Sequence, residues 1–159
     1  MLTCKDSREL LSLFQRHSVR FLVVDGYAVM RYSEPRSTKD LDLWISPKRR
    51  NAKAVYAALG EFGAPLKGLE PDDFSQPGYF YQLGKPPLRV DVMMSIPGVD
   101  FEAAWERRDV LELDGLEIPF ICRSDLIRAK RAGGRPQDLL DAAELEEAAR
   151  LDEESPEGF

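Results

Sequence analysis

The sequence contains few of the side chains that bind soft metals. It has two cysteines, Cys4 and Cys122, and one histidine, His17. Three such residues, far apart in the chain, do not make a structural zinc site, which takes four ligands. The sequence also lacks an apolar run approaching the roughly 18 residues of a membrane-spanning helix. Its first residues lack the basic and then apolar segments of a secretory signal. These absences favour a cytoplasmic protein without a membrane partner.

The chain has no excess of positive charge, and its net charge is −6. Of its 28 acidic and 22 basic residues, seven acidic residues and one arginine lie from Glu144 onward, which leaves 21 of each sign in residues 1–143. A neutral body argues mildly against a large electrostatic RNA-binding surface. A chain of 159 residues, 43% of them hydrophobic, is typical of one globular domain. We expect this domain at residues 1–150, followed by an acidic, disordered tail at residues 151–159.

Helical and strand spacings alternate along the sequence. Apolar residues recur at helical spacing in six segments, at residues 6–16, 27–34, 48–62, 99–108, 124–133 and 137–151. Strand patterns occupy residues 20–26, 40–45, 79–84 and 88–94, and a hairpin with an Asp-Gly turn covers residues 110–121. The residues between 63 and 78 are rich in Gly, Pro and Asp and are expected to form a loop. This order predicts an α+β fold in which one mixed β-sheet is flanked by helices.

Two of the expected strands carry carboxylates between apolar residues. Asp40 and Asp42 alternate with leucines, and residues i and i+2 of a strand point to the same side. Neighbouring carboxylates repel unless a cation lies between them, and Mg²⁺ is a cation that carboxylates and phosphates hold together. Asp91 lies inside a second apolar strand, so three acids on neighbouring strands are able to hold two metal ions. The competing interpretation is a solvent-exposed edge strand, which is the commoner context of an isolated Asp-x-Asp.

A glycine separates the first expected strand from the helix that follows it. Gly26 lets a phosphate approach the backbone, and the free N–H groups of a helix start bind anions. Arg36 and Thr38 precede Asp40, and an arginine at this place is able to reach a triphosphate. Each feature alone also fits an ordinary strand-to-helix turn or a solvated loop. The aromatic residues 79–81 are able to stack on a base, but aromatic residues at strand spacing are usually part of a core.

One superfamily combines a glycine-rich turn, an acid-x-acid strand about ten residues later, and a third acid on a later strand. The chain resembles this polymerase-β-like nucleotidyltransferase superfamily in the segments DGYA (25–28) and RSTKDLDL (36–43) and in Asp91. Lys130 and the segment RPQDLLD (135–141) are similar to a helix lysine and an R-x-K-D-x-x-D segment of small prokaryotic toxin-type members. Those members belong to abortive-infection, type IV-like toxin–antitoxin systems. The resemblance covers roughly residues 20–145.

The resemblance implies a role for each matching residue. The expected ligands of two Mg²⁺ ions, for which Mn²⁺ can substitute, are Asp40, Asp42 and Asp91. Asp91 is also expected to help deprotonate the acceptor hydroxyl, and Lys130 to contact phosphate. The candidate catalytic residues are therefore Asp40, Asp42, Asp91 and Lys130. The residues implied to bind the nucleotide are Gly26, Tyr27, Arg36, Thr38, Lys130 and Asp138.

Two positions depart from the pattern of the superfamily. The turn usually has Gly-Gly or Gly-Ser, whereas this chain has Asp25 before Gly26. An acid beside a triphosphate is unfavourable unless it faces away or meets a metal. Gln137 stands where toxin-type members often have a lysine. From the residues alone, Lys130 also fits a solvent-exposed helix lysine, and Asp138 fits a favourable charge at a helix N-terminus.

The fold and the motifs together predict a metal-dependent nucleotidyltransferase. It would move a nucleoside monophosphate from an NTP to a hydroxyl and release pyrophosphate. The acceptor is open between tRNA, a protein side chain and a small molecule such as an aminoglycoside or a lincosamide. A toxin-type member would also have an antitoxin partner. Two alternatives stay open: a non-catalytic member of the same fold that binds a nucleotide or a protein, and a structural domain whose strand acids face solvent.

Overall fold

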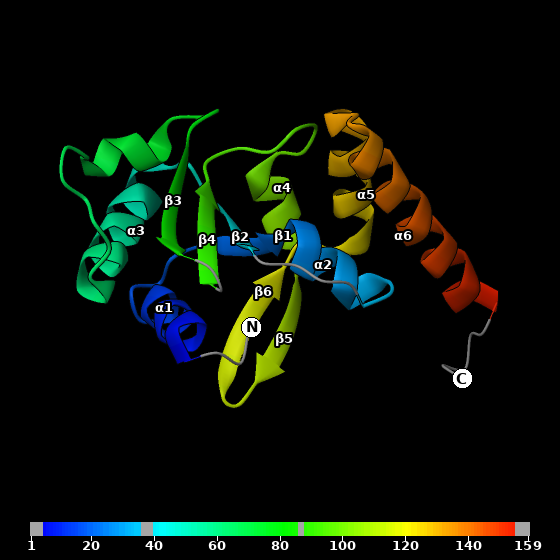
Figure 1. Cartoon of the computed structure of the whole chain (residues 1–159), viewed down its shortest axis with the longest axis horizontal. Helices are drawn as coiled ribbons and strands as arrows, with labels where there is room; N and C mark the ends of the chain where they lie inside the picture. The colour runs from blue at the N-terminus through cyan, green and yellow to red at the C-terminus, as the bar shows by residue number, and fades with distance from the viewer. Residues whose placement is uncertain (1–4, 36–39, 86–87, 155–159) are drawn as a thin grey trace.

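The computed structural model describes residues 5–35, 40–85 and 88–154. Its strands are β1 (Phe21–Val24), β2 (Asp40–Ile45), β3 (Phe80–Lys85), β4 (Leu88–Met93), β5 (Asp109–Leu113) and β6 (Leu116–Phe120). Its helices are α1 (Lys5–Arg16), α2 (Asp25–Tyr32), α3 (Arg49–Phe62), the 3₁₀ helix η1 (Pro71–Ser75), α4 (Phe101–Glu106), α5 (Arg123–Gly133) and α6 (Pro136–Glu154). The strands form one sheet with the order β3-β4-β2-β1-β6-β5 (Figure 1). The expected α+β fold with a mixed sheet flanked by helices is confirmed.

Strand directions are mixed within the sheet. Strand β1 pairs antiparallel with β2 and parallel with β6, and β2 pairs parallel with β4. Strands β3 and β5 pair antiparallel with β4 and β6 and form the two edges. The register places Asp42 opposite Asp91 on β4 and opposite Val24 on β1. Because Val24 is the last residue of β1, helix α2 begins beside these two acids.

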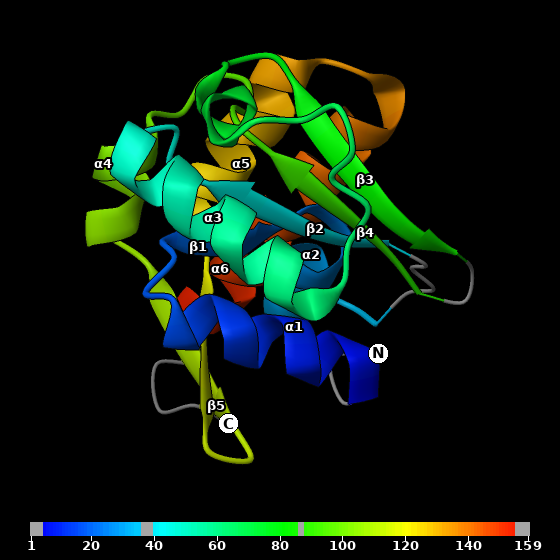
Figure 2. The same cartoon turned by 90° about the vertical axis from the view of Figure 1, so that its left-hand side faces the viewer.

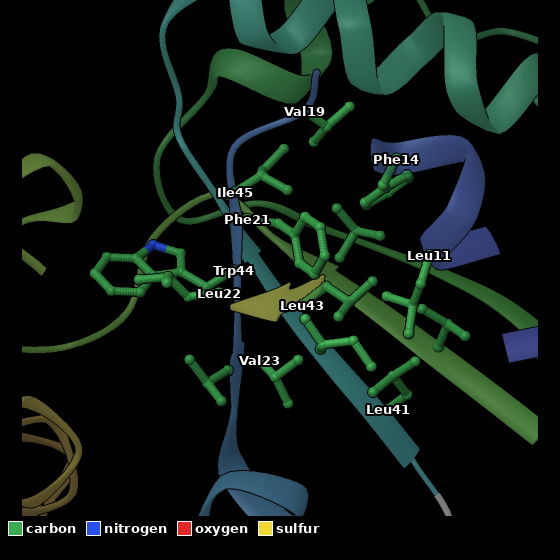
Figure 3. Close-up of a cluster of buried hydrophobic side chains, with 14 of the residues drawn as sticks. Leu11, Phe14, Val19, Phe21, Leu22, Val23, Leu41, Leu43, Trp44 and Ile45 are labelled. Atoms are coloured by element: carbon green, nitrogen blue, oxygen red, sulfur yellow. The ribbon is translucent and has the colours of Figure 1, made fainter. Parts of the chain in front are cut away.

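Strand β2 contributes its apolar residues to a core on one face of the sheet. Leu41, Leu43 and Ile45 are buried, and they alternate with the acids along the strand. Helices α1 and α3 cover this face and lie in front of the sheet in Figure 2. Figure 3 shows Leu11 and Phe14 of α1 beside the apolar side chains of β1 and β2. The core therefore fixes which face of β2 its carboxylates occupy, because a shift by one residue would turn them into the apolar core beneath α1 and α3.

On the opposite face of the sheet, β2 carries an apolar residue at one end and acids at the other. The ring of Trp44 meets the ring of Phe101 in α4 at 5.0 Å between centroids. Asp42 and Asp40 lie two and four residues before Trp44 and so share its face. Helices α2, α5 and α6 lie on the right-hand side of the sheet in Figure 1. One end of β2 thus anchors the sheet to α4, and the other end presents carboxylates.

The loop expected at residues 63–78 contains the short helix η1. Its Phe74 is buried between Tyr56 and Tyr81, with ring centroids 6.2 and 5.6 Å away. The hydroxyl of Tyr81 donates a hydrogen bond to the carbonyl oxygen of Pro65 at 2.6 Å. The burial of one aromatic ring explains why this Gly- and Pro-rich segment folds onto α3.

Helix α6 extends further than the sequence pattern predicts. It ends at Glu154, so four residues of the expected disordered tail are helical. Arg150 forms ion pairs with Glu147 and Glu154, three and four residues away, which lie on its side of the helix. The last five residues of the chain lie outside the described part. Within the described residues, no helix has both the length and the apolar character needed to cross a membrane.

Helix α5 is fixed at its start by a buried carboxylate. Asp125 is fully buried and accepts two hydrogen bonds from Arg107, at 3.1 and 2.9 Å. Arg128 donates a third hydrogen bond to Asp125 at 3.2 Å. A planar guanidinium that binds a carboxylate through two N–H groups restricts both distance and orientation. This contact ties α5, which carries Lys130, to the segment after α4.

Leu43 tests the role of the α1–α3 face in stability. We expect Leu43→Ala to lower the free energy of unfolding by about 2–5 kcal/mol, because it leaves a cavity in a fully buried position. Urea unfolding followed by circular dichroism measures this loss. The matched control is Leu139→Ala on α6, whose leucine is 47% exposed, and we expect it to change stability by less than about 0.5 kcal/mol. Equal losses in the two variants would contradict this description of the core.

Candidate functional site

The register of three strands gathers carboxylates at one place on the sheet. Asp42 on β2 lies opposite Asp91 on β4, which in turn lies opposite Gln82 on β3. The Gln82 side chain donates a hydrogen bond to Asp91 Oδ1 at 2.8 Å and so orients that carboxylate. Asp40 shares the face of Asp42, and Asp25 follows directly after the neighbouring strand β1. Four acids, from two strands and the start of one helix, therefore lie near one another.

Burial and repulsion between these acids act most strongly on the Asp42 carboxyl. Its residue is 8% exposed. Burial, followed by the nearby carboxylates of Asp25, Asp91 and Asp40, raises the pKa of Asp42 to about 8. A hydrogen bond with Asp91 also favours the protonated form. The Asp42 carboxyl is therefore mostly protonated at neutral pH unless a cation is bound beside it.

Lys130 is the buried cation that faces these acids. Its Nζ lies 2.6 Å from Asp25 Oδ1, 3.1 Å from Asp141 Oδ2 and 3.7 Å from Asp138 Oδ1. Only 7% of its side chain is exposed. Burial alone lowers the pKa of Lys130, but Asp25 and Asp141 raise it, and the net shift is upward. The ammonium therefore stays charged and connects α2, α5 and α6.

Asp138 reaches Lys130 because the chain has a glycine beside it. A Cβ atom at Gly133 would lie 2.6 Å from Asp138 Oδ2, closer than side-chain atoms approach each other. Arg135 donates two side-chain hydrogen bonds to Asp138, at 2.9 and 3.1 Å, and these lower the pKa of that carboxyl. Gln137 donates a hydrogen bond to Asp141 Oδ1 at 2.8 Å. The start of α6 thus holds two carboxylates in place toward Lys130.

Two cavities meet at these charged side chains. The larger has a volume of about 560 Å³ and extends to Tyr79 and Phe80, which are 67% and 65% exposed. The smaller, of about 360 Å³, reaches Gly26 and the start of α6. Both volumes are in the range of small-molecule sites. The residues that line both cavities are Asp25, Asp40, Asp42, Lys130, Arg135 and Asp138.

The carboxylates fit a hard divalent cation by their chemistry. Carboxylate oxygens are the ligands that Mg²⁺ takes from proteins, and such an ion also binds phosphates. Burial and the neighbouring carboxylates raise the pKa of Asp42, so a cation beside it would favour its charged form. Within residues 5–35, 40–85 and 88–154, no three His, Cys, Asp or Glu side chains are arranged around one point as a finished metal site. A cation would therefore have to draw the oxygens of these acids together.

Most residues expected from the sequence line these cavities. The larger one is lined by all four candidate catalytic residues, Asp40, Asp42, Asp91 and Lys130. Gly26 and Asp138 line the smaller one. Tyr27 instead packs against the hydrophobic core from α2. Arg36 and Thr38 lie outside the described residues.

Sequence reasoning assigned no role to three residues that the structure places around Lys130. Asp141 lies three residues after Asp138, so the two share a helix face, and this spacing is a signal for their joint contact. Asp25 is recognisable in the sequence as an acid in place of a glycine, but the sequence does not indicate its contact with Lys130. Arg135 opens the RPQDLLD segment in the sequence, but its contact with Asp138 depends on the turn between α5 and α6.

The fold is shared with known nucleotidyltransferase structures. No protein-family model matches the chain, and no curated protein sequence matches it. The crystal structure of the lincosamide antibiotic adenylyltransferase LnuA bound to lincomycin is similar, with a TM-score of 0.56, 16% identity and coverage of 91% of this chain and 96% of that chain. A candidate nucleotidyltransferase from Thermotoga maritima has a TM-score of 0.54 and 16% identity over 95% of this chain and 91% of that chain. At this identity the similarity shows the fold, and the chemistry rests on the site itself.

The raised pKa of Asp42 predicts a pH dependence of stability in the absence of divalent cations. Between its ordinary value near 3.8 and about 8, the folded state holds a proton that the unfolded chain releases. Stability therefore falls as the pH rises through this window, with a slope that approaches about 1.4 kcal/mol per pH unit. Urea unfolding in EDTA at several pH values measures the slope.

The matched variant is Asp42→Asn, which keeps the shape of the side chain and removes its charge. We expect it to lose this part of the slope and to be more stable than the wild type at pH 8, because it relieves the repulsion by neighbouring acids. The same slope in both proteins would show that Asp42 does not titrate in this window.

Proposed function

We propose that the chain is a divalent-cation-dependent nucleotidyltransferase. In the proposed reaction, an acceptor hydroxyl oxygen forms a bond to the α-phosphorus of an NTP. The bond from that phosphorus to the oxygen bridging to the β-phosphate breaks, and pyrophosphate leaves. The observation that carries the proposal is the pairing of Asp42 with Asp91 across β2 and β4, in one cavity with Asp40 and Lys130.

Each part of this chemistry has side chains suited to it. Asp40, Asp42 and Asp91 would hold the cations, which supply positive charge to the phosphates. Asp91 is the proposed acceptor of the hydroxyl proton. The hydrogen bond from Gln82 fixes the orientation of its carboxylate. Lys130 is the proposed phosphate ligand, because it is charged, buried and open to both cavities.

The phosphate chain would lie toward the smaller cavity. Gly26 lines it beside the first turn of α2, where backbone N–H groups lack helical partners. Arg135 also lines it and is 76% exposed along its side chain. An exposed guanidinium that lines a cavity is suited to a polyphosphate.

A second candidate function is nucleotide binding without transfer. It is favoured by one observation, the ion pair at 2.6 Å that already engages Lys130 with Asp25. A chain in which this pair persists would bind a nucleotide through other contacts and leave the α-phosphate unreacted. Binding without pyrophosphate release distinguishes this function from transfer.

The acceptor and the toxin-type subgroup are further parts of the proposal. The exposed rings of Tyr79 and Phe80 in the larger cavity suit an acceptor with a flat or apolar surface. Such a surface occurs in the exposed bases of tRNA and in small molecules, including the lincomycin bound by LnuA. A toxin-type member with an antitoxin partner would arrest growth when expressed alone.

A transfer assay tests the proposed function. The protein is incubated with Mg²⁺ or Mn²⁺, each labelled NTP in turn, and total tRNA, lincomycin, an aminoglycoside or no added acceptor. We expect label on one acceptor and release of pyrophosphate. Asp42→Asn should lower the rate by about a thousandfold or more, because it removes a charge that the cations need.

The control for a general charge effect is Glu117→Gln, which removes a charge at an exposed position of β6 and should retain full activity. Growth arrest on expression, lost in the Asp42→Asn variant, would support the toxin-type subgroup. Transfer at the wild-type rate by the Asp42→Asn variant would overturn the mechanism. Nucleotide binding with no pyrophosphate from any acceptor would favour the second candidate function.

A further inference from the structure

The Asp25 carboxylate contacts Lys130 where a phosphate would have to bind. Their distance of 2.6 Å is the shortest of the three that join Lys130 to carboxylates. Both residues line both cavities, so their ion pair lies where the two cavities meet. A polyphosphate that uses Lys130 therefore has to share it with Asp25 or replace that carboxylate.

Asp25 differs from the other two partners of Lys130 in its freedom to move. The side chains of Asp138 and Asp141 are 5% and 1% exposed, and Arg135 and Gln137 hold them in place. The Asp25 side chain is 35% exposed. Solvent can hydrate its carboxylate after the ion pair opens, whereas the other two carboxylates would stay buried. Asp25 is therefore the partner that an incoming anion can displace.

The backbone at Asp25 also shows that this carboxylate is present against local preference. Its φ is +56°, in the left-handed region that glycine adopts without steric cost. Its charge is unfavourable as well, because it adds to the repulsion that raises the pKa of Asp42. The contact that offsets both costs is the ion pair with Lys130.

We propose that Asp25 is a built-in competitor for the phosphate chain of the nucleotide. In this structure its carboxylate binds Lys130 where the two cavities meet. A polyphosphate takes its place on Lys130, and the Asp25 side chain turns to solvent. The inference rests on the proposed function and adds a regulation of nucleotide binding to it. Asp25 is a positioning residue in this scheme, because it acts through Lys130.

Calorimetric titration with tripolyphosphate in the presence of Mg²⁺ tests the competition without requiring transfer. The variants are Asp25→Asn, which keeps the side-chain shape, and Asp25→Gly, which suits the positive φ. We expect both to bind tripolyphosphate on the order of tenfold more tightly than the wild type, because a charge-assisted competitor is removed. A tighter complex is not the result of a damaged fold, so this readout separates competition from a structural role.

Two controls separate direct competition from a change in net charge. Glu117→Gln removes one negative charge, as Asp25→Asn does, but at an exposed position of β6, and it should leave the affinity unchanged. The titrations are repeated at about 0.5 M KCl, where electrostatic attraction is screened beyond about 4 Å. The ratio between the Asp25→Asn and wild-type affinities should persist there, because the competing atoms are in contact.

Unchanged or weaker binding by both Asp25 variants would overturn the inference. So would a ratio that disappears at high salt, or the absence of tripolyphosphate binding by all of the proteins. The proposed function is judged separately, by label transfer and its loss in Asp42→Asn. Tighter binding by the Asp25 variants with no transfer to any acceptor would support the competition and reject the transferase.

Discussion

The buried ammonium of Lys130 is the interaction on which the rest of the site depends. Carboxylates from α2 and α6 lie within 3.7 Å of it, and the lysine itself comes from α5. A buried lysine keeps its charge only with such partners, and crowded carboxylates are tolerated only beside a cation. The ammonium therefore links three helices that also pack apolar residues into the core. The buried Asp125, bound by Arg107, fixes the start of α5 and holds the lysine at this place.

The acids on the sheet are less well compensated than those on the helices. Asp138 has an arginine partner and a lowered pKa, whereas burial and three neighbouring carboxylates raise the pKa of Asp42 to about 8. A cation bound beside these carboxylates would relieve their mutual repulsion, and it would also attract phosphates. An anion that enters this site would be repelled by the same carboxylates, and Lys130 is the buried cation that would attract it. In the proposed function, stability and ligand binding would depend on the same few side chains.

Much of the fold and part of the site could be predicted from local sequence patterns. Alternation with period two identified β2 and β4, and it also placed Asp40 and Asp42 on one face of the sheet. The pairing of β2 with β4 and not with β3 could not be predicted in this way, because strand order depends on long-range contacts. The helical extent of α6 was underestimated, since ion pairs of Arg150 stabilise a segment whose acidic composition favoured disorder.

The sequence by itself determined the α+β class and the shared face of the strand acids, because each depends on residues close together in the chain. Only the tertiary structure decided which charges meet. Lys130 and Asp25 are 105 positions apart and form the central ion pair of the site. Asp25 was visible in the sequence as an acid at a glycine position, but its partner was not. Ion pairing depends on distance in space and on burial, and neither is contained in a local pattern of residues.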